Sequence, residues 1–219
     1  MTTRIALIHA TRAAIAPIET AFSEVWPEAE QWSLLDEDLN QSLNQAGELT
    51  EKLGDRFIRL ASYAADTSID GLLFTCTAFG PLIEECQRRF PFPTLKPNEA
   101  MFETAIESGL NIGLLASHPV ALPELTAQLS TLAKKQSHEI TITPQLVAGA
   151  WDALAAGNQE VHDHMVINAA QNLHKCDVVL LAQFSMAPLA KAIQSTLSSK
   201  VITSPHAAVS KLRRVLNQR

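Results

Sequence analysis

Residues 70–82 read DGLLFTCTAFGPL, and residues 177–189 read DVVLLAQFSMAPL. The two stretches align without a gap at an offset of 107 residues. Each begins with an aspartate, continues with an apolar run of strand length, and ends on a Pro-Leu pair. This correspondence indicates that the chain contains two copies of one structural unit.

Two further matches support the duplication. Residues 5–8 (IALI) correspond to residues 112–115 (IGLL) at the same offset, and residues 96–101 (KPNEAM) match 204–209 (SPHAAV) after a shift of one residue. Any parallel α/β protein repeats apolar strands followed by small residues, which would explain a single match. Three matches in the same order favour an internal duplication.

The fold class follows from the spacing of the apolar runs. Strands are predicted at 5–8, 71–74, 112–115 and 178–181, and the longer stretches between them have helical spacing. This alternation predicts an α/β fold of two similar parallel-sheet halves, with an active-site cleft between them. We expect the first half over 1–100 and the second over 101–204, and the C-terminal helix 205–219 could pack on the first half.

Composition narrows the class of protein. A chain of 219 residues with 47% hydrophobic and 18% charged residues is typical of a folded protein and can form one large or two small domains. The formal net charge is −6, and no basic stripe extends beyond a short cluster near the C-terminus, which argues against nucleic acid as a partner. We find neither a membrane-spanning run nor a signal peptide, and we expect a cytoplasmic protein without a membrane partner.

One of the three cysteines is placed for chemistry. The cysteines show neither the density of a disulfide framework nor a C-x-x-C spacing. Cys86 falls on a predicted helix over 81–89 and Cys176 precedes its strand, so both are expected to be buried small hydrophobes. Cys76 follows strand 71–74, near the backbone amides that open the next helix, where the pKa of a thiol can be lowered. A thiolate there could act as a base on a C–H bond.

Polar side chains follow the other predicted strands as well. In open parallel sheets, ligands bind beyond the carboxyl ends of the strands, and hydroxyl, imidazole and amide groups there can hold a carboxylate. The expected substrate-binding residues are His9, Thr11, Thr75, Thr77, Ser117, His118 and Gln183.

Two other polar groupings are ambiguous. His162 and His164 are two residues apart and point to different sides of a helix, so we predict a solvated helical face and no metal site. The acidic residues of the stretch 34–39 could line the mouth of a cleft, but helix capping or solvation is favoured.

The loop around Cys76 resembles a known family. Residues 74–80 (FTCTAFG) are similar to the first catalytic-cysteine loop of the aspartate/glutamate/hydantoin racemase superfamily, and the resemblance extends to four further stretches, 34–36, 98–101, 115–117 and 183–187. It implies two α/β halves with the active site between them, an isomerase that needs no cofactor, and Cys76 as its acid or base. A small carboxylate would be the substrate, and racemases of this type often form homodimers.

The sequence departs from this family at one position. Classical members use two cysteines, one per half, whereas the repeat places Gln183 where the second is expected. A glutamine side chain has no proton to exchange near neutral pH. Ser185 is the nearest hydroxyl and would need help from His206 or His118. The candidate catalytic residues are therefore Cys76, Ser185 and His206.

The leading interpretation is a racemase-like isomerase that transfers a proton at the carbon alpha to a carboxylate. Its substrate would be a small amino acid, a hydantoin or a dicarboxylate. One-cysteine relatives are decarboxylases, so a lyase of the malonate type is one alternative. A non-catalytic protein that binds small carboxylates is the other.

Overall fold

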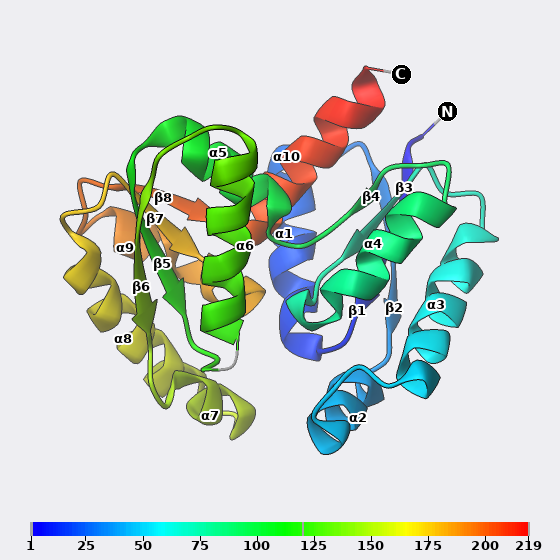
Figure 1. Cartoon of the computed structure of the whole chain (residues 1–219), viewed down its shortest axis with the longest axis horizontal. Coiled ribbons are helices and arrows are strands. Elements are labelled where there is room, and N and C mark those ends of the chain that lie inside the picture. The colour runs from blue at the N-terminus through cyan, green and yellow to red at the C-terminus, as the bar shows by residue number, and fades with distance from the viewer. Residues whose placement is uncertain (1, 120, 219) are drawn as a thin grey trace. The chain divides into compact units, whose positions relative to one another are not determined.

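The computed structural model describes residues 2–119 and 121–218, which form two compact units. The described part of the first unit runs over 2–99 and 208–218, and that of the second over 100–119 and 121–207. Each unit is a four-stranded parallel sheet with helices against its faces (Figure 1). The predicted α/β fold of two similar halves is confirmed.

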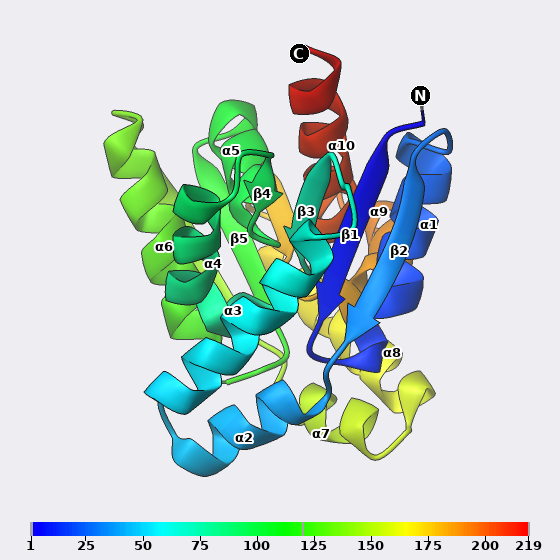
Figure 2. The same ribbon diagram turned by 90° about the vertical axis from the view of Figure 1, so that its right-hand side faces the viewer.

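The first unit contains a sheet with the strand order β2-β1-β3-β4. Figures 1 and 2 show α3 and α4 on one face of this sheet and α1 on the other. Its elements are β1 (Arg4–His9), η1 (Arg12–Ala14), α1 (Ile15–Val25), β2 (Glu30–Leu35), α2 (Asp38–Ala46), α3 (Glu51–Ala65), β3 (Gly71–Phe74), η2 (Thr77–Phe79), α4 (Gly80–Arg89) and β4 (Thr94–Leu95).

The second unit repeats this plan with the strand order β6-β5-β7-β8. Two helices connect the units in sequence, α5 (Glu99–Ser108) and the C-terminal α10 (Ser204–Asn217). The remaining elements are β5 (Asn111–Ala116), α6 (Ala121–Lys135), β6 (Thr141–Leu146), α7 (Ala150–Ala155), α8 (Gln159–Ala170), η3 (Gln171–Leu173), β7 (Val178–Leu181), η4 (Phe184–Leu189), α9 (Ala190–Gln194) and β8 (Lys200–Thr203).

The strand register repeats along with the strand order. Ile5 pairs with Gly71 in the first sheet, and Ile112 pairs with Val178 in the second. Ile5 and Ile112 are 107 positions apart, and so are Gly71 and Val178, which is the offset of the sequence alignment. The four strands that the sequence predicted are the two central strands of each sheet, and the four edge strands were missed.

The core of the first unit explains why its helices form where they do. One face of the central strands packs against α3, whose buried residues recur with helical spacing, and Thr50 caps this helix by accepting a hydrogen bond from the Leu53 N–H. The Phe57 ring stacks on Phe74 and Phe79, with centroids 4.8 and 5.0 Å apart. Each fully buried aromatic or aliphatic side chain contributes about 1.5–3 kcal/mol to folding.

The second unit has a core on each face of its sheet. Ile112, Leu114, Val178 and Leu180 pack against α5 and α6 on one face. Residues of β5 and β7 that point the other way pack against α7, α8 and α9. Because both faces of the central strands are covered, their sequences read as nearly continuous apolar runs.

The C-terminal helix α10 packs on the first sheet. A Cβ atom on Gly71 would lie 3.3 Å from Leu212 and 3.4 Å from Leu216, so the missing side chain lets the helix approach β3 closely. The Arg213 guanidinium donates to the Val25 carbonyl at 2.6 Å, and Lys211 forms an ion pair of 2.9 Å with Glu99.

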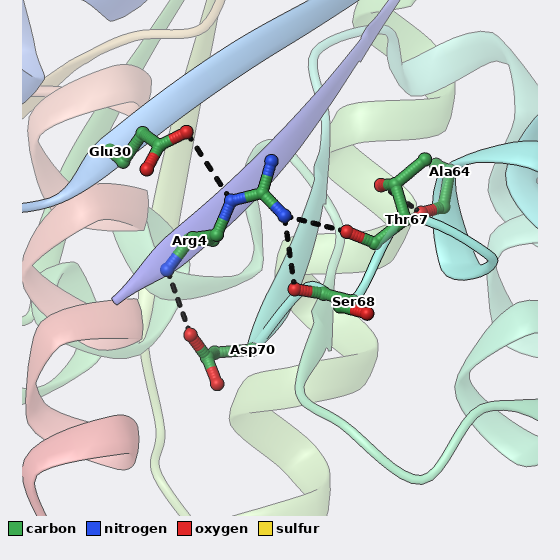
Figure 3. Close-up of polar contacts among 6 residues, drawn as sticks. All are labelled: Arg4, Glu30, Ala64, Thr67, Ser68 and Asp70. Carbon is green, nitrogen blue, oxygen red and sulfur yellow. Dashed lines mark hydrogen bonds and ion pairs between the residues drawn. The ribbon is translucent and has the colours of Figure 1, made fainter. Parts of the chain in front are cut away.

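Arg4 joins the amino ends of three strands in the first unit (Figure 3). Its guanidinium forms a 3.3 Å ion pair with Glu30 and donates to the Thr67 carbonyl at 2.7 Å. The Arg4 backbone N–H donates to Asp70 Oδ2 at 2.8 Å, and the Asp70 N–H donates back to the Arg4 carbonyl at 2.8 Å. This reciprocal pair fixes β1 against the start of β3.

The second unit contains the same reciprocal pair at the repeat positions. The Asn111 N–H donates to Asp177 Oδ2 at 2.8 Å, and the Asp177 N–H donates to the Asn111 carbonyl at 2.8 Å. The Leu110 N–H also donates to Asp177 Oδ2, at 3.0 Å. These backbone donors hold the pKa of the Asp177 carboxyl below its usual value.

Replacing Asp177 by alanine is expected to lower the thermal unfolding midpoint, because the N–H groups that open β5 lose their acceptor. Asp177→Asn should be less harmful, since the amide keeps one acceptor oxygen. Circular dichroism melting of both variants tests this, with the exposed Glu139→Gln as the control. An unchanged midpoint for Asp177→Ala would contradict the assigned role.

No helix within 2–119 or 121–218 combines the length and the apolar character required to cross a membrane.

Candidate active site

His9 lies at the carboxyl end of β1 and is completely buried. Its Nδ1 is 2.9 Å from Thr75 Oγ1, and its Nε2 is 3.0 Å from Ser33 Oγ. The Thr75 hydroxyl also lies 3.3 Å from the Ile8 carbonyl, so His9, Thr75 and Ser33 belong to one hydrogen-bond network. Burial lowers the pKa of His9 to about 4, and the ring is therefore neutral near pH 7.

This network changes the interpretation of two predicted substrate-binding residues. His9 has no exposed surface and both ring nitrogens are occupied, and Thr75 is buried with its hydroxyl bonded within the network. Neither side chain offers a free polar group to a substrate. We assign both to joining the ends of β1, β2 and β3.

Cys76 follows directly after Thr75 at the carboxyl end of β3. It is half-buried and stands at the N-cap position of η2, with extended backbone dihedrals. Burial raises the pKa of the Cys76 thiol, while hydrogen bonds with the Ala78 backbone N–H and with the Asn40 side chain act in the opposite direction. The expectation of a lowered thiol pKa is therefore wrong, because the cost of burying the anion exceeds the stabilisation that these two hydrogen bonds provide.

Asn40 is a neighbour of Cys76 that the sequence analysis missed. It lies in the first turn of α2, and its Oδ1 accepts a hydrogen bond from the Cys76 thiol at 3.5 Å. Its Nδ2 donates to the Ala10 carbonyl at 2.9 Å. The signal available in the sequence was its place just beyond the acidic stretch after β2, a strand that apolar periodicity did not reveal.

The acidic stretch before Asn40 forms ion pairs. Arg56 of α3 binds Asp36 at 2.5 Å and also pairs with Asp38, and Arg12 binds Glu37 at 2.8 Å. No helix-capping hydrogen bond from the Glu37 side chain is present at the start of α2. Glu37 and Asp38 are exposed, so the prediction of solvation holds for them, and basic residues of η1 and α3 pair with these carboxylates.

The remaining predicted threonines of the first unit lie at the same strand ends. Thr11 is half-buried and caps η1, with its Oγ1 accepting from the Ala13 N–H at 3.4 Å. Thr77 is half-buried and begins η2 next to Cys76. Both are partly accessible, unlike Thr75.

Gln183 occupies the position of Cys76 in the second unit. It lies at the carboxyl end of β7, and its Oε1 accepts a hydrogen bond from the Ser117 backbone N–H at 2.9 Å. The amide oxygen is thus bonded to the end of β5, and the NH2 group remains as a donor that could bind a substrate. Gln183 therefore joins two strand ends instead of supplying an exchangeable proton.

Three other polar groups at the strand ends of the second unit are buried. Among the described residues, no hydrogen-bond partner is found for Ser117 Oγ, Ser185 Oγ or His118 Nδ1. Ser117 is only 1% exposed, so its hydroxyl is costly to leave unpaired. The His118 ring meets Trp151 edge-on at 5.1 Å, and burial lowers the His118 pKa, opposed by the charge of Asp152.

His206, a candidate catalytic residue, lies in the first turn of α10. Its Nδ1 is 2.7 Å from Thr203 Oγ1 at the end of β8. It is half-buried and belongs to the second unit, as Ser185 does.

The remaining cysteines and two histidines of α8 differ in burial. Cys86 and Cys176 are buried as expected, and burial raises the pKa of Cys86 to about 12. His164 is exposed, but His162 is fully buried with Nδ1 2.7 Å from Asp163, so the prediction of a solvated face is wrong for His162. Residues 2–119 and 121–218 contain no group of three or more His, Cys, Asp or Glu side chains suited to a metal ion.

Solved structures with similar folds include several racemases. Glutamate racemase RacE1 from Bacillus anthracis superposes with a TM-score of 0.75 at 12% identity, covering 99% of this chain and 82% of that chain. Allantoin racemase from Klebsiella pneumoniae gives 0.71 at 16% identity, covering 99% and 88%. A Gly74Cys mutant of arylmalonate decarboxylase gives 0.67 at 14% identity, covering 98% and 93%. At these identities the similarity establishes the fold.

Sequence comparison identifies the family. A comparison with curated proteins finds no match. The sequence model of the Asp/Glu/hydantoin racemase family matches residues 27–212, which includes Cys76, Gln183 and most of both units. This chain therefore belongs to the Asp/Glu/hydantoin racemase family.

Proposed function

We propose that the chain is a racemase-like isomerase that transfers a proton at the carbon alpha to a carboxylate, with Cys76 as the acid or base. The proposed substrate is a small amino acid, a hydantoin or a dicarboxylate. The observation that carries the proposal is the position of Cys76. The thiol is half-buried at the carboxyl end of a central strand and next to the Ala78 N–H.

The surroundings of Cys76 suit proton transfer. A thiol that is protonated near pH 7 can give a proton to a carbanion, and the Ala78 N–H stabilises the thiolate that is left. Thr11 and Thr77 offer half-buried hydroxyls at the same strand ends, and we propose that they bind the substrate carboxylate. In the second unit, Ser117, His118 and Gln183 are proposed for the same role, and Ser185 and His206 for help in proton transfer.

A one-sided lyase is the second candidate function. Gln183 favours it, because its Oε1 is bonded to the Ser117 N–H and its side chain cannot act as a second acid near neutral pH. A single protonated cysteine is sufficient to protonate a carbanion from one face after loss of carbon dioxide. The second candidate therefore keeps the same role for Cys76 and changes only the bond that breaks first.

Solvent-deuterium exchange followed by NMR tests both candidates. The protein is incubated in D2O with single enantiomers of amino acids, with hydantoins, with malonates and with maleate. Deuterium at the alpha carbon with loss of optical purity would support the isomerase, and release of carbon dioxide from a malonate would support the lyase. No exchange or turnover on any compound, in protein that binds one of them by calorimetry, would contradict both and favour a binding protein.

A further inference from the structure

Trp151 occupies the place in the second unit that Asn40 occupies in the first. In each unit, the residue after the outer strand donates its N–H to the carbonyl at the end of the central strand. Asp36 donates to the end of β1 at 3.0 Å, and Val147 donates to the end of β5 at 2.8 Å. Asn40 lies four residues after Asp36, and Trp151 lies four residues after Val147. The first turn of α7 therefore carries an indole where α2 carries the amide that contacts Cys76.

The backbone before Trp151 is anchored to the sheet. Val147 and Ala150 are buried in the core of the second unit, at 3% and 0% exposure. Gly149 has a φ of 79°, a left-handed conformation that glycine adopts without strain, and this turn starts α7. The position of the indole is thus fixed by the packing of its own helix start.

The indole lies over the end of β5. Its ring meets the His118 ring at 5.1 Å with an interplanar angle of 69°. His118 directly follows Ser117, whose backbone N–H donates to Gln183 Oε1 at 2.9 Å. Trp151 is half-buried, so part of its ring surface is open to a ligand at the strand ends.

The polar groups around Trp151 are uncharged donors. Ser117 Oγ belongs to a side chain that is 1% exposed and has no hydrogen-bond partner within 2–119 and 121–218, and Gln183 offers its NH2 group. Such donors can hold one carboxylate, or the carbonyl groups of a hydantoin.

Nothing at these strand ends favours a second carboxylate. Residues 116–119, 147–152, 182–187 and 203–206, which adjoin the ends of the four strands, contain no lysine or arginine. Asp152, next to Trp151, is exposed and acidic, and its charge reaches His118. A second carboxylate would therefore meet a like charge and find no cation to pair with.

We propose that Trp151 is a specificity-determining residue that packs against an aromatic ring of the substrate. The inference rests on the proposed function and narrows its substrate class to an amino acid or hydantoin that carries such a ring, with dicarboxylates excluded. An indole face suits a planar, uncharged group, because offset-stacked and edge-on aromatic pairs are both favourable.

Binding of three probe acids tests the inference without any turnover. Phenylacetate offers a carboxylate and a ring, acetate the carboxylate alone, and succinate a second carboxylate. We expect phenylacetate to bind about tenfold more tightly than the other two and to shift the Trp151 indole N–H signal in NMR titrations. Single substitutions assign that signal among Trp26, Trp32 and Trp151.

Trp151→Leu keeps an apolar side chain but removes the aromatic face. Its affinity for phenylacetate, measured by ligand-observed NMR, should fall about threefold to tenfold, while acetate and succinate change by less than about twofold. Trp151→Phe should retain most of the phenylacetate affinity. Tyr63→Leu, which removes a 62% exposed ring from α3 in the first unit, is the matched control and should bind all three acids as the wild type does.

The pattern across the probes separates specificity from a loss of structure. A disrupted strand end would weaken acetate and phenylacetate together and would not be rescued by phenylalanine. No binding of phenylacetate, tighter binding of succinate than of phenylacetate, or equal losses for all three acids in Trp151→Leu would overturn the inference.

Proton exchange then distinguishes the inference from the proposed function. Trp151-dependent binding of phenylacetate in a protein that exchanges no alpha proton would uphold the role of Trp151 and contradict the proposed function. Faster exchange on aspartate than on phenylglycine would do the reverse. Where phenylglycine is exchanged, Trp151→Leu should raise KM and change kcat little, because the ring contact is the same before and during proton transfer.

Discussion

Replacing Cys76 by serine is expected to reduce substrate alpha-proton exchange by about 10²- to 10⁴-fold, the usual contribution of a positioned acid or base. A serine hydroxyl has nearly the same shape but is a far weaker acid than a thiol. The loss should therefore appear mainly in kcat, while KM changes little. Exchange rates measured by NMR for the best substrate of the panel provide the test.

The control for Cys76→Ser is Cys86→Ala. Cys86 is fully buried on α4, away from the strand ends, so its replacement should leave exchange within about twofold of the wild-type rate once folding is verified by circular dichroism. Equal losses in the two variants, or full activity of Cys76→Ser, would rule out Cys76 as the acid or base.

Acidification is expected to destabilise the protein through His9. The pKa of this ring falls from 6.5 to about 4 on folding, so the unfolded chain binds a proton between these values while the folded protein does not. The stability that His9 contributes is fully present above pH 6.5 and is lost progressively as the pH falls towards 4. The loss amounts to about 3 kcal/mol over this window.

Urea unfolding at a series of pH values measures this effect. The free energy of unfolding should fall more steeply between pH 6.5 and 4 in the wild type than in His9→Gln, which cannot titrate there. The comparison uses the slope, so a general destabilisation by the substitution does not obscure it. The exposed His138→Gln is the control and should keep the wild-type slope, whereas a wild-type slope in His9→Gln would show that His9 is not the titrating group.

The strands show why part of the fold was readable from the sequence. β1, β3, β5 and β7 are central and covered on both faces, so selection for burial leaves continuous apolar runs. The edge strands β2 and β6 carry exposed residues at several positions, and β6 contains Pro144. An edge strand can accept such residues because one side of its backbone needs no partner strand. Apolar periodicity alone therefore could not identify these strands.

The candidate site, like the strands, was predictable only in part from the sequence. The duplication located Cys76 and Gln183 at equivalent strand ends, because matched sequence spacing implies matched position in each unit. It could not reveal that His9 is buried or that Ser33 completes its hydrogen bonds, since this contact spans 24 residues and depends on the missed strand β2. In the structure His9 has no exposed surface, and both of its ring nitrogens lie within hydrogen-bond distance of protein hydroxyls.

Cys76 shows which properties of the site can be predicted from the sequence and which cannot. By itself the sequence determined the duplicated α/β plan, the two central strands of each sheet, and the single cysteine at a strand end. The tertiary structure alone decided the direction in which its pKa is shifted. A thiol's pKa depends on how completely water is removed and on which atoms face the sulfur, and one of those atoms, Asn40 Oδ1, comes from a residue 36 positions away.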